Sequence, residues 1–272
     1  MSEGGIASSP APNCEFKLYP VGPEILAGLI VFPLEQAKQV LMKYREFVKT
    51  APEELNIWVL LRKAPPLPFL PEKVHGKEII VLVVFYSGEI ETSKKLIEPL
   101  RSFGEMYGEH IGSQPYVNWQ QAFDPLLESG ARNYWKTHNF TEPSDGALDK
   151  MIEYAGKLPS PQCEIFLALI SGAANRVPSE AMAYGHRSIK FVVNVHARWD
   201  KPAQDKTCIT WAREFFNATK PFASSGAYIN FMTEDEGGRV TAAYGSNYER
   251  LAKIKKQYDP ENIFHHNQNI KP

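Results

Sequence analysis

Two polar residues alternate within an apolar run in the second half of the chain. In the stretch KFVVNVHARW, one residue separates Asn194 from His196, and alternate residues of a β-strand point to the same side. Polar side chains on one face of an apolar strand indicate that this face lines a cavity. There, a neutral histidine near a hydroxyl group can assist proton transfer. A face that is simply exposed to solvent is an equally good interpretation. Asn194 and His196 are therefore candidate substrate-binding residues.

A second group of candidate substrate-binding residues lies in the aromatic segment QPYVNWQQAFD, which contains Tyr116, Trp119 and Gln120. Aromatic walls with a few amides suit a sugar or a polyphenolic ligand, which they bind by stacking and by directional hydrogen bonds. Aromatic loops that pack on their own domain are commoner. Packing is therefore the stronger alternative for these three residues.

The run AYINF places Tyr228 and Asn230 on one face of a predicted strand. A phenol has an unperturbed pKa of about 10, so it acts as a base only near positive charge or hydrogen-bond donors. An amide offers both a donor and an acceptor, and Asn230 can therefore orient the tyrosine or bind a ligand. From the residues alone, a half-buried strand tyrosine is the favoured interpretation of Tyr228. For Asn230, pairing with backbone at a strand end is equally good.

The composition is that of an ordinary globular protein, with 43% hydrophobic and 22% charged residues. Lysine and arginine number 30 against 31 aspartates and glutamates, so no broad charge attracts nucleic acid or an anionic membrane. The three cysteines, Cys14, Cys163 and Cys208, form neither a disulfide framework nor a metal-binding spacing. No metal site is predicted. The N-terminus lacks the pattern of a secretory signal, so a cytoplasmic location is expected.

The elements that must position these residues alternate between strands and helices. Apolar runs predict strands at 14–20, 25–33, 56–61, 78–86, 164–170, 190–199 and 227–231. Helical spacing predicts helices after Pro33 and at 91–103, 144–158, 203–219 and 247–258. The aromatic stretch 107–140 is predicted to be irregular. This order indicates an α+β fold, a mostly antiparallel sheet with helices packed on one face. It forms one domain over residues 15–272, after a disordered segment 1–14.

Several common catalytic signatures are absent from the sequence. There is no G-x-G-x-x-G after a strand and no P-loop, and no G-x-S-x-G elbow indicates a hydrolase triad. On these grounds alone, an enzyme that holds a nucleotide cofactor by itself is not predicted.

The C-terminal stretch YGSNYERLAKIKKQYDPENIFHHNQNIKP, together with AYINF before it, resembles the C-terminal signature of the berberine bridge enzyme-like flavoproteins. These belong to the vanillyl-alcohol oxidase type of FAD-linked oxidases. Upstream, GPEILAGLIVFPLEQAKQVLMKYREF resembles the opening of the family's substrate domain. The resemblance covers the chain from Glu15 onward and implies the fold of that substrate domain.

The resemblance also implies residue roles. Tyr228 matches the first tyrosine of the family's Y-x-N-Y motif, which is the general base that removes a proton from the substrate hydroxyl. Asn194 and His196 lie on the strand that corresponds to one with substrate contacts. The chain departs from the motif at Phe231, which stands where the family has a tyrosine and removes one hydroxyl from the site. The residues assigned to the FAD side are Asn230, Tyr244, Asn247 and Asn269.

In the family, the FAD-binding half precedes the region that this chain resembles, and residues 1–14 contain nothing comparable. The chain is therefore expected to be the substrate-binding portion of an FAD-dependent oxidoreductase acting on a hydroxyl-bearing small molecule, such as a sugar, an aromatic alcohol or a polyketide-like compound. The expected partners are a separate FAD-binding chain or a second copy that associates through the exposed cofactor-facing surface. The alternative is a non-catalytic ligand-binding or interaction domain that retains the fold without flavin.

Overall fold

The computed structural model describes residues 17–224, 226–266 and 268–272. The segment 1–14, for which disorder is predicted, lies outside the described residues. Within these residues the chain forms a seven-stranded sheet in which all neighbouring strands are antiparallel. Its strands are β1 (Glu24–Pro33), β2 (Leu55–Lys63), β3 (Glu78–Tyr86), β4 (Gly108–Pro115), β5 (Arg132–Phe140), β6 (Glu164–Leu169) and β7 (Phe191–Trp199). Their order across the sheet is β4-β1-β3-β2-β6-β7-β5.

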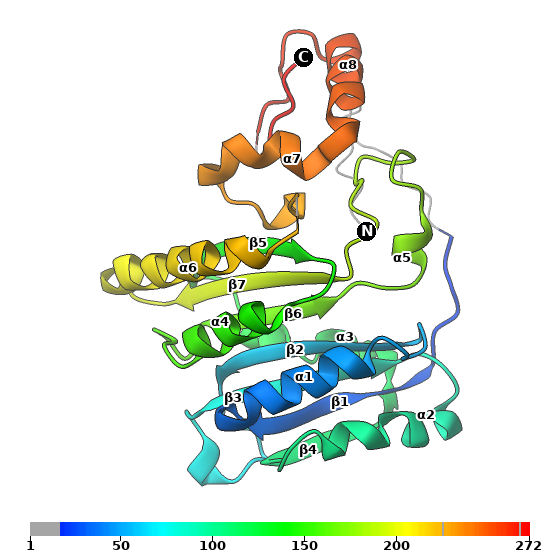
Figure 1. Ribbon diagram of the computed structural model, residues 1–272, viewed down its shortest axis with the longest axis vertical. Helices are drawn as coiled ribbons and strands as arrows, with labels where there is room; N and C mark the ends of the chain where they lie inside the picture. Colours follow the sequence, from blue (N-terminus) through cyan, green and yellow to red (C-terminus); the bar gives the residue numbers. More distant parts are fainter. Residues whose placement is uncertain (1–16, 225, 267) are drawn as a thin grey trace.

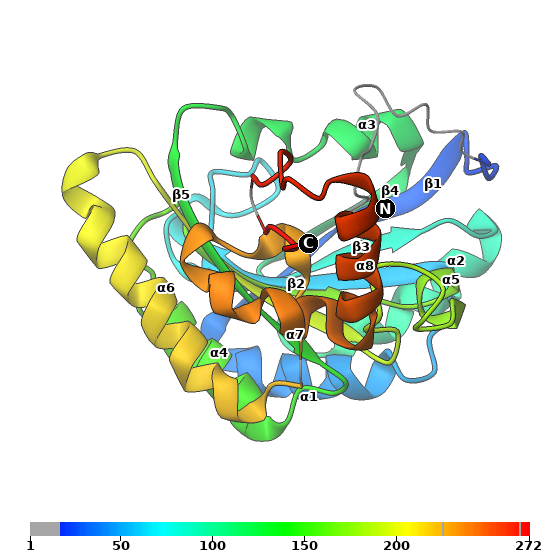
Figure 2. The ribbon, with the colours of Figure 1, turned by 90° about the horizontal axis from the view of Figure 1, so that it is seen from above.

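The longer helices cover one face of this sheet (Figures 1 and 2). They are α1 (Ala37–Phe47), α2 (Ile90–Ile97), α4 (Asp145–Ala155) and α6 (Asp205–Thr219). Two short helices, α3 (Tyr116–Gln121) and α5 (Ala173–Arg176), lie elsewhere. The 3-10 turns are Leu34–Gln36, Glu72–Val74, Glu98–Ser102, Asp124–Leu126, Pro202–Gln204, Lys220–Phe222, Ile229–Phe231, Glu234–Arg239 and Gly245–Asn247. The predicted α+β fold, a mostly antiparallel sheet with helices packed on one face, is confirmed.

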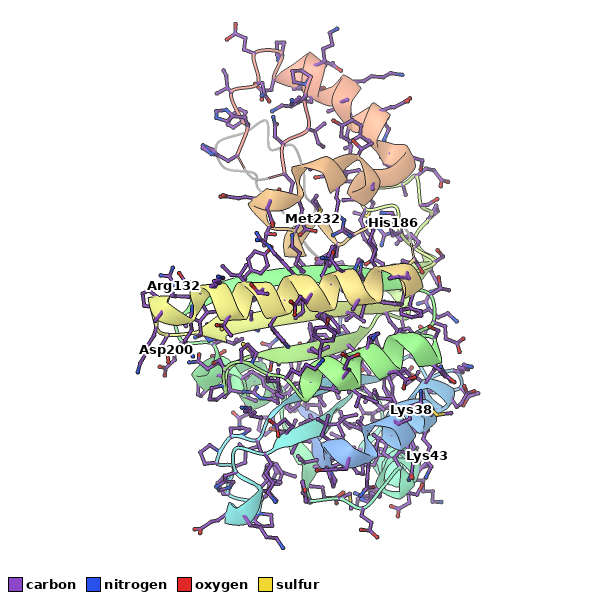
Figure 3. All side chains as sticks on the ribbon, turned by 60° about the vertical axis from the view of Figure 1, so that its left-hand side comes forward. Lys38, Lys43, Arg132, His186, Asp200 and Met232 are labelled. Carbon is purple, nitrogen blue, oxygen red and sulfur yellow. The ribbon has the colours of Figure 1, made fainter. Side chains whose placement is uncertain are left out.

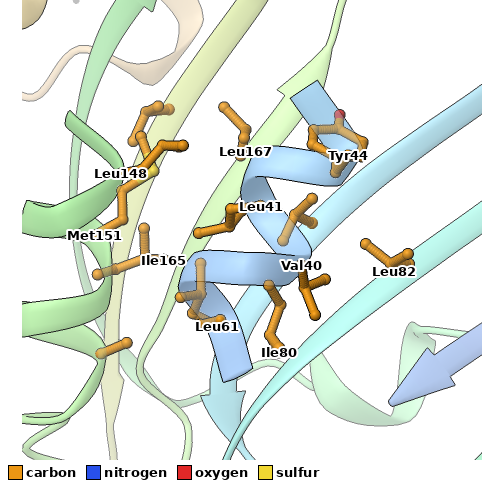
Figure 4. Packing of buried hydrophobic residues seen from close by; sticks show 14 of the residues in the cluster. Val40, Leu41, Tyr44, Leu61, Ile80, Leu82, Leu148, Met151, Ile165 and Leu167 are labelled. Atoms are coloured by element: carbon orange, nitrogen blue, oxygen red, sulfur yellow. The ribbon is translucent and has the colours of Figure 1, made fainter. Parts of the chain in front are cut away.

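The main core lies between the sheet and these helices. Figure 4 shows Val40, Leu41 and Tyr44 of α1 against strand residues of β2, β3 and β6. The Tyr44 hydroxyl donates to the backbone oxygen of Ile57 at 2.8 Å, which satisfies the one polar atom that this ring buries. Ser144 caps α4, since its hydroxyl accepts a hydrogen bond from the Ala147 backbone N–H. Because every β-strand alternates, the residues between these core positions point to the opposite face.

That opposite face divides into two parts. Over β1 and β3, a smaller apolar cluster that includes Val31, Val81 and Val83 packs against Leu70 and Val74 of the loop between β2 and β3. Over β2, β6 and β7, the outward residues include charged and amide side chains, beside a small apolar cluster of Ala168, Ile189 and Val192.

The C-terminal segment leaves the sheet and folds on itself. It contains α7 (Val240–Tyr244) and α8 (Tyr248–Tyr258), which stand beyond β5 in Figure 1. A separate cluster holds it together, with Ala227, Met232 and Leu251 among its buried members. The buried Asp259 carboxylate closes the turn after α8, because it pairs with Lys255 and accepts from the Ile263 backbone N–H at 2.7 Å.

Some predicted elements differ from the structure. The stretch 107–140 is not irregular, because it contains both edge strands, β4 and β5. The predicted strand at 227–231 is wrong: Ile229–Phe231 is a 3-10 turn. Residues 17–20 of the first predicted strand have no regular structure, and its residues 14–16 lie outside the described part. None of the helices in the described ranges is long and apolar enough to cross a membrane.

Candidate functional site

A cavity of about 670 Å³ opens on the sheet face opposite α1, α4 and α6. Its apolar walls are aromatic, and Trp58 packs edge-on against Phe166 with 4.9 Å between ring centroids. The segment from Phe123 to Ala131, between α3 and β5, supplies a further wall. A cavity of this size, with aromatic walls and with polar groups that can orient a ligand, is typical of a small-molecule site.

Strand register brings the polar residues of the cavity together. On β7, His196 lies directly between Trp135 of β5 and Glu164 of β6. One step along the same face, Asn194 lies opposite Phe166. Both side chains are buried and both line the cavity. The cavity face that the Asn194 and His196 alternation predicts is therefore present in the structure.

One end of the cavity is a network of charges. The Arg62 Nη1 atom lies 3.0 Å from Glu164 Oε2, and His196 Nδ1 lies 3.3 Å from the other carboxylate oxygen, Oε1. Burial raises the pKa of the Glu164 carboxyl, but hydrogen bonding to His196 and the charge of Arg62 more than offset it. The net result is a pKa below the usual glutamate value, so Glu164 is a carboxylate at neutral pH.

The other ring nitrogen of His196 also faces an oxygen. Nε2 lies 3.1 Å from Asn133 Oδ1, whose amide is oriented by a hydrogen bond from its own Nδ2 to the Ala131 backbone oxygen. Each ring nitrogen of His196 thus lies within hydrogen-bonding distance of a side-chain oxygen. Arg198 completes this end by donating from Nε to Gln162 Oε1 at 2.9 Å. Asp200, labelled in Figure 3, accepts from Gln162 Nε2 and marks the limit of the network.

Two polar atoms at the cavity wall remain without partners. Asn194 Nδ2 and Trp135 Nε1 are both buried, and neither has a hydrogen-bond partner among the described residues. Such atoms are uncommon in folded proteins because each costs the free energy of losing its hydrogen bond to water. Both belong to residues that line the cavity.

Tyr228 lies next to this cavity in a cage of aromatic rings. Its ring is 5.1 Å from that of Phe231, and Phe231 is in turn 5.6 Å from Trp135 at the cavity wall. On the other side, Tyr184 packs edge-on at 6.0 Å. The hydroxyl of Tyr228 accepts a hydrogen bond of 3.1 Å from Asn230 Nδ2. The side chain is half-buried, so it is not sealed in the hydrophobic interior.

Arg187 places a positive charge against Tyr184, the ring that packs on Tyr228. The Arg187 guanidinium sits over the Tyr184 ring, 4.9 Å from its centroid. Burial raises the pKa of the Tyr184 phenol, and the Arg187 charge opposes part of that rise. Nearby, His186 Nε2 lies within hydrogen-bonding distance of the Ala242 and Ala243 backbone oxygens, which ties this loop to α7. Figure 3 shows His186 and Met232 between β5 and the C-terminal segment.

The sequence profile of the family described as "Berberine and berberine like" matches residues 227–271. An FAD-linked oxidoreductase of Dictyostelium discoideum is 28% identical, over 94% of this chain and 54% of its own length. Berberine bridge enzyme-like C-1 of Nicotiana tabacum is also 28% identical, over 47% of this chain and 28% of its own. Most of the chain is therefore similar to FAD-linked oxidoreductases, and its C-terminal segment is similar to the berberine and berberine like family.

Solved structures share the fold of this chain. BBE-like #28 from Arabidopsis thaliana superposes with a TM-score of 0.78 and 17% identity, covering 92% of this chain and 57% of that one. Berberine bridge enzyme from Eschscholzia californica gives a TM-score of 0.76 and 19% identity, covering 94% and 57%. The chain spans about half the length of the curated relatives that it matches over most of its residues, 54% for the Dictyostelium protein.

The berberine-type C-terminal segment uses two predicted cofactor-side residues internally. Tyr244 is buried in the cluster of the C-terminal segment. Asn247 is also buried, and its Nδ2 donates to the Ser179 and Met182 backbone oxygens at 2.7 and 3.0 Å. Both amide hydrogens of Asn247 are therefore engaged, and neither is available to a cofactor. Asn230 is exposed and Asn269 is half-buried, so these two side chains reach the surface.

The structure does not bring Tyr116, Trp119 and Gln120 into the cavity with Asn194 and His196. They lie on α3, where Gln120 Nε2 donates to the Tyr116 hydroxyl at 2.9 Å and Trp119 packs edge-on against Phe123. Their predicted role in substrate binding stays a prediction, and it concerns a surface outside this cavity. Packing, the stronger alternative, accounts for Trp119, and only Phe123 from this region reaches the cavity wall.

Several cavity residues were not predicted from the sequence. Trp58 and Arg62 lie on β2, and Glu164 and Phe166 on β6. The available signal was the same alternation that identified Asn194, since Trp58 and Arg62 share one face of an apolar run and Glu164 and Phe166 share one face of another. Tyr184 was missed as well, because a loop carries no periodicity that points to a site.

Proposed function

We propose that this chain supplies the substrate cavity and the general base of an FAD-dependent oxidoreductase that oxidises a hydroxyl-bearing small molecule. The observation that carries the proposal is the Tyr228–Asn230 pair, which stands half-exposed beside the cavity in a berberine bridge enzyme-like chain. The flavin would be held by a region outside these residues, either elsewhere in the same protein or on another chain.

The residues present fit one edge of a flavin ring. The Asn230 amide is exposed and offers a donor and an acceptor, and the Tyr228 hydroxyl stands on the same turn. These two side chains would contact the cofactor, with Asn269 further along the tail. FAD, when bound, supplies the two-electron acceptor for the oxidation.

The chain's own residues would then bind the substrate and move its proton. The aromatic walls would hold a flat or ring-shaped substrate, with its hydroxyl directed toward the Tyr228 phenol. Tyr228 would take the hydroxyl proton, and the Asn230 N–H would stabilise the charge on the phenol oxygen while it is deprotonated. Phe231, which stands in the place of a tyrosine, cannot share that proton.

A second candidate function is a ligand-binding domain that acts without flavin. It is favoured by one observation: β2, β5, β6, β7 and the segment from Phe123 to Ala131 already wall a cavity of about 670 Å³. Equilibrium binding of sugars, aromatic alcohols and phenolic polyketide analogues to the purified chain tests the cavity under both candidates.

Flavin binding and substrate oxidation distinguish the proposed oxidoreductase from the ligand-binding domain. The chain alone is expected to be colourless, and adding the FAD-binding region of a related oxidase is expected to give flavin absorbance and substrate-dependent dioxygen uptake. Ligand binding without any oxidation in the flavin-loaded assembly would favour the second candidate. Stoichiometric FAD on the lone chain after gel filtration would contradict the placement of the flavin site outside these residues.

A further inference from the structure

The cavity wall carries two hydrogen-bond donors that the protein itself does not use. Asn194 Nδ2 and Trp135 Nε1 lack partners within the described ranges, although Asn194 is only 1% exposed. Leaving a buried donor unpaired costs about 1 to 3 kcal/mol, so two of them in one wall are a substantial loss of stability. Natural proteins commonly retain such costs at sites where a ligand provides the missing partner.

The two donors belong to neighbouring positions on one face of the sheet. Trp135 lies opposite His196 and Thr137 lies opposite Asn194, so Trp135 and Asn194 are diagonal neighbours across β5 and β7. Diagonal pairs of this kind are within reach of each other's side chains when one of them is aromatic. The terminal amide torsion of an asparagine is broad, so Nδ2 can turn toward the cavity at little cost.

We propose that Asn194 and Trp135 form a donor pair that binds the oxygen acceptor of a flat aromatic ligand, which narrows the substrate class to aromatic compounds with a carbonyl-type oxygen. This inference rests on the proposed function, in which the cavity holds the substrate. The rings of Trp58, Phe166 and Phe231 supply the stacking surfaces for the aromatic part of the ligand.

The charges of the cavity favour a neutral oxygen over a carboxylate. Arg62 is paired with Glu164, and Arg198 donates to Gln162 and to the Glu128 backbone oxygen. Both cavity guanidinium groups are thus engaged within the protein, while the Glu164 carboxylate would repel an anion. A neutral carbonyl accepts two N–H donors without requiring a free cation.

The test compares two probes of the same shape. 2-Acetylnaphthalene carries a carbonyl where 2-isopropenylnaphthalene carries a CH₂ group, so only the first can accept a hydrogen bond. Their dissociation constants are measured by equilibrium dialysis against the parent chain, Asn194→Leu and Trp135→Phe. The phenylalanine keeps an aromatic ring and removes only the N–H. We expect the parent to prefer the ketone by about 5- to 30-fold, since each neutral hydrogen bond contributes a few-fold.

Each variant should lose a large part of that preference while binding the hydrocarbon as before. Phe166→Leu is the matched control, because it removes a stacking surface and should weaken both probes equally. Equal affinity of the parent for both probes, or a preference unchanged in both variants, would overturn the donor pair and leave the cavity as a binding site. If neither probe binds the parent at all, the proposed function fails as well.

A measurement without ligand checks the same inference. Removing an unpaired buried donor takes away a cost, so the thermal midpoints of Asn194→Leu and Trp135→Phe should equal or exceed that of the parent. A marked fall in the midpoint of both variants would show that the two N–H groups already have partners in the protein, and would overturn the proposal.

Discussion

The Asn230 side chain donates a hydrogen bond to the Tyr228 hydroxyl at 3.1 Å, across a single intervening residue. This contact exists because Ile229–Phe231 forms a tight 3-10 turn instead of the predicted strand. An extended strand would place the two side chains on one face about 7 Å apart at the backbone. The turn thus brings the amide to the phenol more closely than the predicted strand does.

If Tyr228 is the base, its loss should affect catalysis and not folding. In the flavin-loaded assembly, Tyr228→Phe is expected to slow flavin reduction by about 10²- to 10⁴-fold, the usual contribution of a positioned base. Asn230→Ala should slow it by about 10-fold, the value of one hydrogen bond. Stopped-flow absorbance at the flavin band measures both rates.

Tyr184→Phe is the matched control for these variants, because Tyr184 packs against Tyr228 at 6.0 Å and would lose only its hydroxyl. Its rate should stay within about threefold of the parent, well below the effect of removing the base. A larger loss in Tyr184→Phe than in Tyr228→Phe would assign the base to Tyr184 instead.

His138 should make the protein sensitive to acid. Its ring stacks on Phe216 at 4.1 Å, and burial lowers the pKa of the imidazole to about 4. The folded state therefore resists protonation that the unfolded chain accepts from about pH 6.5 downward. The stabilising contribution of neutral His138 is complete above pH 6.5 and is lost as the pH falls toward 4.

Between pH 7 and pH 4, this residue should remove about 3 kcal/mol from the free energy of unfolding. His138→Gln keeps a side-chain amide near the Phe216 backbone oxygen, which lies 2.9 Å from Nε2, but does not titrate. Urea unfolding at both pH values should give the variant a flatter dependence. Parallel losses in parent and variant would refute the assignment to His138.

The local sequence pattern was sufficient to predict that β7 faces a cavity. It was not sufficient to predict which residues of other strands line the same cavity. The alternation of Asn194 and His196 on β7 could be recognised from ten residues. The ion pair of Arg62 and Glu164 could not be predicted in this way, because the two residues are 102 positions apart and meet only through the pairing of β2 with β6. Strand order depends on the whole sheet and on its helix packing, and a local pattern carries no information about it.

The edge strands and the turn at Tyr228 were missed for different reasons. The β4 sequence GEHIGSQP has two glycines and few β-branched residues, and it forms a strand only because β1 supplies a partner. AYINF has strand propensity, but Ala227 and Met232 are buried in the cluster of the C-terminal segment and not in the sheet. Tertiary packing decides such short segments.

Gly28 should be indispensable to the pairing of β1 with β4. A Cβ atom at this position would lie 1.9 Å from the His110 backbone oxygen and 2.6 Å from the Ile111 Cα atom. The backbone cannot make that room without separating the two strands, so Gly28→Ala should cost at least about 2 kcal/mol of stability. Gly112→Ala, on β4, is the control, because its Cβ would meet no atom within 4 Å. Denaturant unfolding of both variants decides the point, and equal stability would contradict the close approach.

Glu164 should stabilise the charged end of the cavity, because its carboxylate pairs with the buried guanidinium of Arg62. Glu164→Gln leaves Arg62, whose side chain is 11% exposed, without its carboxylate, and leaves one amide oxygen where two carboxylate oxygens face Arg62 and His196. We expect a loss of about 2 to 4 kcal/mol in the free energy of unfolding, because an uncompensated buried charge is expensive. Adding Arg62→Met should recover most of it, since the stranded charge is then gone. Glu153→Gln on α4 removes a solvent-exposed carboxylate that also pairs with two lysines, and should change little. A double variant less stable than Glu164→Gln alone would show that Arg62 serves the fold by packing rather than by its charge.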